Sequence, residues 1–187
     1  MMDEKNVYEL FSELYQIQDE TIRKLTCSAL VKGINIGGWT TDTIDKAPVN
    51  INWKGCPSNL ITHIRKVKQA CINAYEILDD FYTQNGVPLN RAYTVAGAIL
   101  HEVGKFLVYK LLDGKPINRH KKELLRHPIS GAILVASEGL PEEIVHIVAL
   151  HSFEGEKSYK TQEATFVREI DEFVFRGTVS GLTKEVL

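Results

Sequence analysis

The sequence has few cysteines and no pattern that pairs them. It contains three in 187 residues, Cys27, Cys56 and Cys71, and no two of them have the CxxC spacing. An odd number of widely separated cysteines predicts neither a disulfide framework nor a thiolate zinc site. We therefore expect reduced thiols and a fold that is stabilised by its apolar core.

Long apolar runs and an excess of charge of one sign are also missing. No stretch of about 18 apolar residues is free of charge, and the opening MMDEKN has neither the basic nor the apolar part of a signal peptide. The 22 Lys and Arg residues nearly balance the 24 Asp and Glu residues, which gives a net charge of −2. These absences predict a cytoplasmic protein and argue against a membrane or nucleic acid partner.

The residues that are present predict one domain over residues 1–187. Apolar residues make up 44% and charged residues 25% of the chain, and a chain of this size buries roughly 70% of its unfolded surface. Helical spacing of apolar residues predicts a helical hairpin over 1–32 and a helical core over 58–176. Glycine and proline interrupt residues 33–58, which predicts a long loop, either a lid over a site or a surface insertion.

The core is expected to be all-α, with a central buried helix over 91–112. This segment is apolar on nearly every side, as a fully enclosed helix is. No alternating run bounded by hairpin turns appears, so no sheet is expected. The other helices of the core are predicted over residues 58–84, 128–138, 141–152 and 163–176.

Titratable residues fall on the apolar faces of these helices. His101 and Glu102 lie in the central helix, where an uncompensated carboxylate costs several kcal/mol. Taken alone, His101 also fits a hydrogen-bonded core histidine, and Glu102 a salt-bridge partner of Lys105. His146 and His120, in contrast, fall on faces expected to be exposed. The inward set as a whole matches what a pair of divalent metal ions needs: His63, His101, Glu102, His127, His151 and Asp171.

These segments, in this order, resemble the HD-domain family of metal-dependent phosphohydrolases over about residues 58–176. The resemblance is carried by NLITHIRKV at 59–67, HEVGK at 101–105, HPISGA at 127–132, LHS at 150–152, TQEA at 161–164 and IDE at 170–172. One departure is chemical. Glu102 stands where the family has Asp, so its carboxylate reaches one methylene farther and can alter the spacing or number of the metals.

The resemblance implies an HD-like helical bundle and a dinuclear metal site. One metal would take His63, His101, Glu102 and Asp171, and the other Glu102, His127 and His151. The two divalent ions, iron, manganese, nickel, cobalt or magnesium, would activate a hydroxide that attacks phosphorus. Glu102 and Lys105 would then be catalytic, and Lys105 would also bind the substrate phosphate.

A basic stretch over 115–126 suggests where further phosphate is docked. It holds Lys115, Arg119, Lys121, Lys122 and Arg126 against the single acid Glu123. Arg126 is the expected substrate-binding residue because its guanidinium can pair with phosphate through two hydrogen bonds. The alternative is a solvated basic turn.

The function expected from these residues is hydrolysis of a phosphorylated small molecule, such as a nucleotide. Two alternatives remain open at this point. Some relatives with the same ligand set are di-iron oxygenases, and non-catalytic members keep the helices for signalling.

Overall fold

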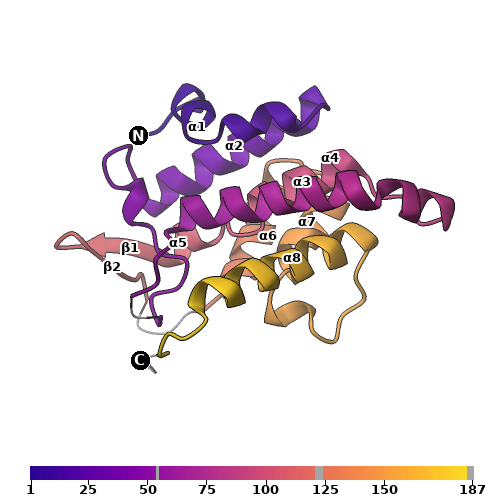
Figure 1. The fold of residues 1–187 in the computed structure, drawn as a ribbon. Coiled ribbons are helices and arrows are strands. Elements are labelled where there is room, and N and C mark those ends of the chain that lie inside the picture. Colours follow the sequence, from indigo (N-terminus) through magenta and orange to yellow (C-terminus); the bar gives the residue numbers. More distant parts are fainter. Residues whose placement is uncertain (54, 121–123, 185–187) are drawn as a thin grey trace.

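The computed structural model describes residues 1–53, 55–120 and 124–184, which form a helical bundle with one short β-hairpin at its end (Figure 1). The central helix is α4, because it contacts α2, α3, α7 and α8. The all-α prediction is confirmed, with the hairpin as its one exception in the described ranges. The elements are α1 (Glu4–Leu10), α2 (Glu20–Gly37), α3 (Leu60–Gln84), α4 (Arg91–Leu100), α5 (Lys105–Val108), β1 (Tyr109–Leu112), β2 (Lys115–Asn118), α6 (His127–Ser137), α7 (Glu142–Leu150) and α8 (Gln162–Val179), with 3₁₀ turns at Ser12–Gln16, Ile44–Lys46 and Phe153–Gly155.

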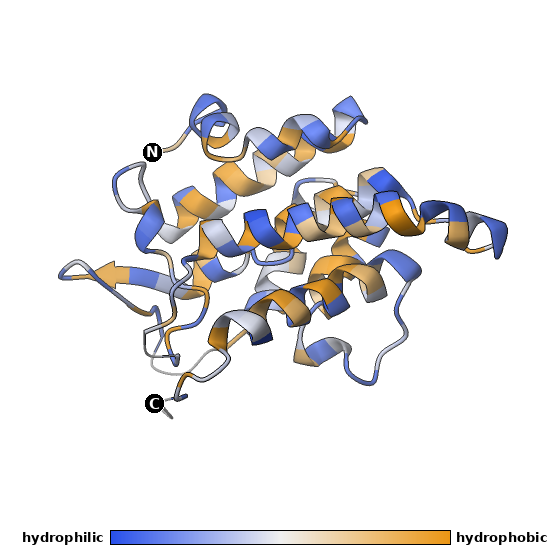
Figure 2. Ribbon diagram, viewed as in Figure 1, coloured by the Kyte–Doolittle hydropathy of each residue, from blue (hydrophilic) through white to orange (hydrophobic). Residues whose placement is uncertain are grey.

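The N-terminal helices form a layer over α4. The side of α2 that faces the rest of the bundle is hydrophobic (Figure 2). The structure carries α2 beyond residue 32, through Gly33, and ends it at Gly38, which has a φ of 77°. The expected loop at 33–37 is therefore helix. The reason is packing: a Cβ on Gly37 would lie 2.1 Å from the carbonyl oxygen of Phe106, so glycine here permits close approach and does not break the helix.

The segment after α2 packs on the core. Trp39 is buried and donates its indole N–H to the carbonyl of Phe106 at 3.0 Å. Backbone bridges join Pro48 to Asn59 and Trp53 to Lys184, so this loop is fastened to the start of α3 and to the end of the chain. Residues 48–53 consequently lie beside α3 and α8 at the end of the bundle that holds the hairpin (Figure 1).

The prediction of one continuous helix over 91–112 is wrong: α4 ends at Leu100, a turn interrupts it, and helix resumes only over Lys105–Val108. Residues 101–104 form a turn in which Val103 donates to Leu100 and Lys105 to Glu102, an i+3 pattern that tightens the helix end. His101 and Glu102 therefore lie on this turn and not within a long helix.

The hairpin that follows α5 was also missed. β1 pairs antiparallel with β2, and Asp113 and Gly114 at its turn both have positive φ, 50° and 74°. Asp-Gly is the dipeptide that such a two-residue turn favours. Four-residue strands are too short to produce a recognisable alternation, so the segment 109–112, which has three apolar residues and one lysine, predicts a continuation of the helix.

The remaining helices begin within two residues of their expected starts. Asn59 caps α3 by accepting from the amide of Thr62 at 2.8 Å, and Thr161 caps α8. No helix within the described ranges is long and apolar enough to cross a membrane.

Gly104 holds the turn against α6, and its replacement by alanine is expected to lower the free energy of unfolding by about 3 kcal/mol. A Cβ at this position would lie 1.9 Å from the carbonyl oxygen of His127, the first residue of α6. The matched control is Gly177→Ala in α8, where nothing lies within 4 Å of the added Cβ. Urea unfolding should show Gly177→Ala stabilised by about 0.5–1 kcal/mol. Equal effects of the two substitutions would contradict the packing argument.

Candidate metal centre

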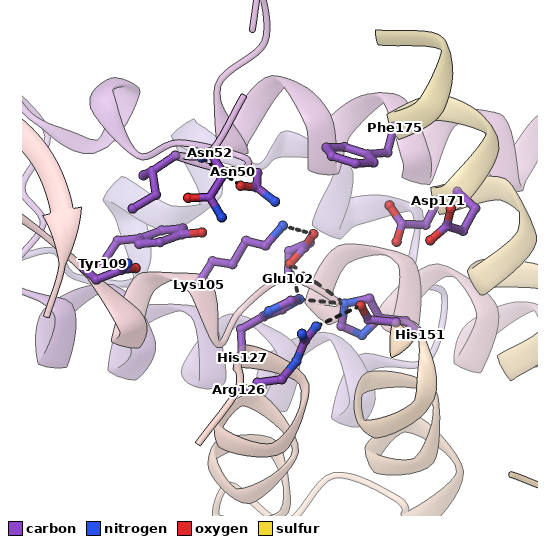
Figure 3. A pocket seen from close by; sticks show the side chains of 14 residues that line it. Asn50, Asn52, Glu102, Lys105, Tyr109, Arg126, His127, His151, Asp171 and Phe175 are labelled. Atoms are coloured by element: carbon purple, nitrogen blue, oxygen red, sulfur yellow. Dashed lines mark hydrogen bonds and ion pairs between the residues drawn. The ribbon is translucent and has the colours of Figure 1, made fainter. Parts of the chain in front are cut away.

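The six predicted ligands converge from five parts of the chain on one buried site. Figure 3 shows four of them, Glu102, His127, His151 and Asp171. His63 comes from the first turns of α3, the pair at 101–102 from the turn after α4, and His127 from the start of α6. His151 directly follows α7, and Asp171 comes from the middle of α8. Their ligand atoms form two groups, each with all atoms within 4.8 Å of one another: His63, His101, Glu102 and Asp171, and then Glu102, His127 and His151.

The first group is built around the Asp171 carboxylate. Asp171 Oδ1 lies 2.9 Å from Nε2 of His63 and 3.6 Å from Nε2 of His101. The two imidazole Nε2 atoms face each other at 3.4 Å. Phe175, one turn further along α8, lies edge-on to the His63 ring with 6.4 Å between ring centroids. Three ligand atoms thus surround one small volume.

The second group is built around the other side of Glu102. Glu102 Oε2 lies 3.1 Å from Nε2 of His127 and 3.8 Å from Nε2 of His151, while Oε1 lies 3.8 Å from His63. The Nε2 atoms of His127 and His151 face each other at 3.2 Å. Among the described residues, Glu102 alone belongs to both groups.

Backbone carbonyls fix which imidazole nitrogen is available. Nδ1 of His101 donates to the carbonyl of Ala98 and Nδ1 of His151 to that of Val148, both at 2.8 Å. A proton on Nδ1 leaves the lone pair of the neutral imidazole on Nε2, which points into the site. This is the orientation that a metal-ligating histidine needs.

The site has an electrostatic requirement that its own side chains do not meet. Glu102 Oε2 is buried and accepts no hydrogen bond of good geometry from the described residues, although His127 is close. Facing imidazole lone pairs repel unless a proton or a cation lies between them. A buried, partly unpaired carboxylate among imidazoles is a donor set that fits divalent transition metals.

The pKa shifts of most of the ligands suit this role. His101 is the exception: burial opposes the change, but the Asp171 and Glu102 carboxylates raise the pKa of its imidazole, so a proton there supplies the positive charge that a cation would bring. Burial lowers the pKa of His151 to about 3, so its imidazole is neutral near pH 7. Burial alone would raise the pKa of the Glu102 carboxyl, but Lys105 and His127 hold it well below its usual range. Asp171 behaves in the same way because His101 and His63 outweigh burial and lower its pKa. Neutral imidazoles and ionised carboxylates are the states that bind metal.

A cavity of about 350 Å³ lies above the two ligand groups. Lys105 and Arg126 both line it (Figure 3). Each already has an acid partner. The buried Lys105 ammonium contacts Glu102 Oε1, so the salt bridge considered from the sequence is formed. Arg126 Nε lies 2.6 Å from Glu154 Oε1, and its guanidinium lies over the Phe153 ring.

Of the other cations of the basic stretch, the two that the structure describes, Lys115 and Arg119, do not line the cavity. Arg119 donates to the carbonyls of Leu107 and Gly37, which holds the hairpin against α2. Lys115 is exposed on the hairpin. Lys121 and Lys122 lie outside the described residues.

The two remaining histidines lie away from the metal groups. His120 is exposed, as expected. His146 is half-buried, and its Nε2 accepts from the amide of Thr161 at 3.2 Å, so it supports the start of α8 instead of being a free surface residue.

Sequence reasoning missed one side of the cavity. Its lining there comes from the loop after α2, the hairpin and α8, namely Asn50, Ile51, Asn52, Tyr109, Asn118, Glu172 and Phe175. The sequence pointed to this side only through the prediction that residues 33–58 form a lid or a surface insertion. That prediction does not identify particular side chains. Their proximity is a product of tertiary packing.

A family model described as "HD domain" matches residues 60–175, and the chain therefore belongs to the HD-domain family. The chain is 29% identical over 140 residues to the dihydroneopterin 2′,3′-cyclic phosphate phosphodiesterase of Methanocaldococcus jannaschii. The alignment covers 73% of this chain and 55% of the relative, so the chain spans about half the length of the relative. No solved structure matches the chain.

Proposed function

We propose that this protein is a metal-dependent phosphohydrolase that cleaves a phosphate ester of a small molecule, such as a nucleotide. The observation that carries the proposal is the Glu102 carboxylate, which reaches both ligand groups at the base of the cavity. Membership of the HD-domain family supports the reaction class. The name of the M. jannaschii relative supports a cyclic phosphate diester as the first substrate to test.

The residues would hold two divalent cations. His63, His101 and Asp171 would bind one, His127 and His151 would bind the other, and Glu102 would serve both. When bound, such cations lower the pKa of water and polarise a phosphoryl oxygen, so that attack at phosphorus needs no side-chain nucleophile.

The chain's own side chains have separate tasks in this proposal. Burial of the ligands keeps bulk solvent from the base of the cavity, which strengthens every charge interaction there. Lys105 lies at the cavity floor within reach of Glu102 and would offset the negative charge that develops on the phosphoryl group. Arg126, held at the mouth by Glu154, would orient the substrate phosphate.

The direct test is hydrolysis by metal-free protein reloaded separately with manganese, iron, nickel, cobalt or magnesium. Suitable substrates are 2′,3′-cyclic nucleotides and p-nitrophenyl phosphate, with products measured by chromatography. Metal-dependent cleavage of a phosphate ester supports the proposal. Metal uptake without any phosphate ester cleavage contradicts it, and oxygen consumption by the iron form would favour the oxygenase alternative.

Replacing Arg126 with alanine is expected to raise KM by ten- to a hundredfold, the loss of one charge-assisted contact with phosphate. Metal content should not change, because the Arg126 guanidinium, although next to His127 in sequence, pairs with Glu154 and hydrogen bonds to Ser152 and not to any of the six ligand side chains among the described residues. Lys24→Ala is the control, since Lys24 is exposed on α2 and pairs only with Glu20 at 2.7 Å among the described residues. A KM within twofold of the parent value at low and high salt would reject phosphate docking by Arg126.

A further inference from the structure

The cavity above the metal ligands has two chemically different halves. Its floor and one rim carry the charged groups, including Lys105 and Arg126. The rest of the lining contains three carboxamides, a tyrosine, an isoleucine and a phenylalanine. Figure 3 shows Asn50, Asn52, Tyr109 and Phe175 on the side away from Arg126. Glu172 also lines the cavity, but its carboxylate is paired with Arg176 at 2.6 Å. Among the described lining residues, this second half contains no cation that could bind another phosphate.

Asn118 supplies an unpaired acceptor in the neutral half. It is the last residue of β2 and pairs in register with Tyr109. The next residue, Arg119, anchors the strand end through the carbonyls of Leu107 and Gly37 at 2.9 and 2.8 Å. Asn118 Oδ1 is buried and has no hydrogen-bond partner among the described residues. A desolvated amide oxygen held this firmly is available to a donor on a ligand.

Asn50 and Asn52 provide a second polar edge, on the loop that bridges to α3 and to the end of the chain. The Asn50 side chain accepts from the backbone amide of Asn52 at 2.9 Å, which fixes its orientation. Its amide nitrogen is not used in this turn. Figure 3 shows both carboxamides beside the space above Lys105 and Glu102.

Phe175 gives the same half an aromatic wall. Its ring is held edge-on by Trp53, at 6.2 Å between centroids, and by His63, at 6.4 Å. In Figure 3 it lies across the cavity from Tyr109. An aromatic face next to amide edges suits a flat group that both stacks and forms hydrogen bonds.

From this arrangement we infer that Asn50, Asn118 and Phe175 form a specificity subsite for an uncharged planar heterocycle attached to the scissile phosphate. This inference rests on the proposed function, because it assumes that the phosphate lies at the metal ligands. A nucleobase and a pterin share the required chemistry, a flat ring with an amide-like edge. The subsite selects a substrate with one phosphate group and a neutral ring over a polyphosphate.

The test compares two cyclic phosphate diesters that share the reacting five-membered ring. One is 2′,3′-cyclic GMP, and the other is glycerol 1,2-cyclic phosphate, which has no heterocycle. The measured quantity is the ratio of their kcat/KM values with the metal-loaded protein. Asn118→Leu should lower this ratio at least about tenfold, mainly through KM for the nucleotide. Its Tm should not fall, because an unpaired buried acceptor is replaced by an apolar side chain of similar size.

Phe175 is tested with a pair of substitutions. Phe175→Leu should lower the ratio about tenfold, whereas Phe175→Tyr, which keeps the aromatic face, should preserve it. Asn73→Leu, on the exposed side of α3, is the control and should not change the ratio. Parallel assays with 2′,3′-cyclic CMP and dihydroneopterin 2′,3′-cyclic phosphate show which heterocycle the parent protein prefers.

The possible failures are distinguishable. If the parent cleaves both diesters and every variant keeps the parent ratio, the subsite is wrong and the phosphohydrolase proposal stands. The inference would also be overturned if the parent protein had similar kcat/KM values for 2′,3′-cyclic GMP and glycerol 1,2-cyclic phosphate, because the heterocycle would then contribute nothing. If the metal-loaded parent cleaves no phosphate ester, the proposed function fails and the subsite fails with it.

Discussion

Replacing Glu102 with glutamine is expected to lower kcat for phosphate ester hydrolysis by about a thousandfold. The substitution keeps the size of the side chain but removes the negative charge, and Glu102 is the described residue that faces both ligand groups. Loss of bound cations removes several kcal/mol of transition-state stabilisation, which corresponds to a rate change of this order. Metal analysis of the purified variant, alongside kcat, should show that the metal content falls with the activity.

Two further substitutions separate charge from reach. Glu102→Asp keeps the charge and restores the acid that the family carries, so it should retain metal and either preserve or raise activity. Glu138→Gln is the control, because Glu138 pairs with Lys32 at 2.6 Å away from the cavity. A Glu102→Gln variant that kept full metal content and rate would show that Glu102 does not have the proposed role.

The burial of His63 and Asp171 followed from helical periodicity, because a buried helix face imposes the same spacing whether its residues are apolar or polar. His63 and Asp171 lie on the stripes of α3 and α8 that contain Val67 and Val167, and all four side chains are buried. The grouping into two ligand sets came from the resemblance to the HD-domain family. The ligand atoms of each set lie within 4.8 Å of one another, which supports the proposal that each set holds one metal ion.

Other features depended on contacts that no local pattern encodes. The spacing of apolar residues after Leu100 predicts that the helix continues. In the structure a tight turn interrupts it, and Gly104 in this turn packs closely against the backbone of α6. Residues 109–112 form a strand because they pair with β2, which is a contact between two segments of the chain. Asn118 and Phe175 are unremarkable in their own segments, and the cavity brings them together from strand and helix.

Two interpretations of Glu102, a salt bridge with Lys105 and a place among the metal ligands, are compatible in the structure. Their spacing of three residues predicts an ion pair on one side of a helix or turn, and the structure contains that contact. The same carboxylate also lies 3.1 Å from His127, which is distant in sequence. Oε1 contacts the lysine and Oε2 faces His127 and His151, so the salt bridge leaves Oε2 available to the proposed cation.

Removing metal is expected to lower Tm by roughly 8–16 °C. Metal present at about a thousand times its Kd stabilises the folded state by about 4 kcal/mol, and each kcal/mol shifts Tm by about 2–4 °C in a domain of this size. The metal-free protein must bury Glu102 Oε2 and facing imidazole nitrogens without a cation between them. The measurement is thermal unfolding of chelated protein before and after metal is restored.

The rise in Tm when metal is restored should depend on the ligand side chains and not on the fold alone. Asp171→Asn removes one of the two carboxylates of the first group, so metal should raise the Tm of this variant by less than half of the parent's increase. Glu138→Gln, in which only the surface pair with Lys32 and Ser28 is altered, should show the full increase. If the parent and Asp171→Asn gain equally from added metal, the metal is bound elsewhere, because a cation held by Asp171 loses a charged ligand in that variant.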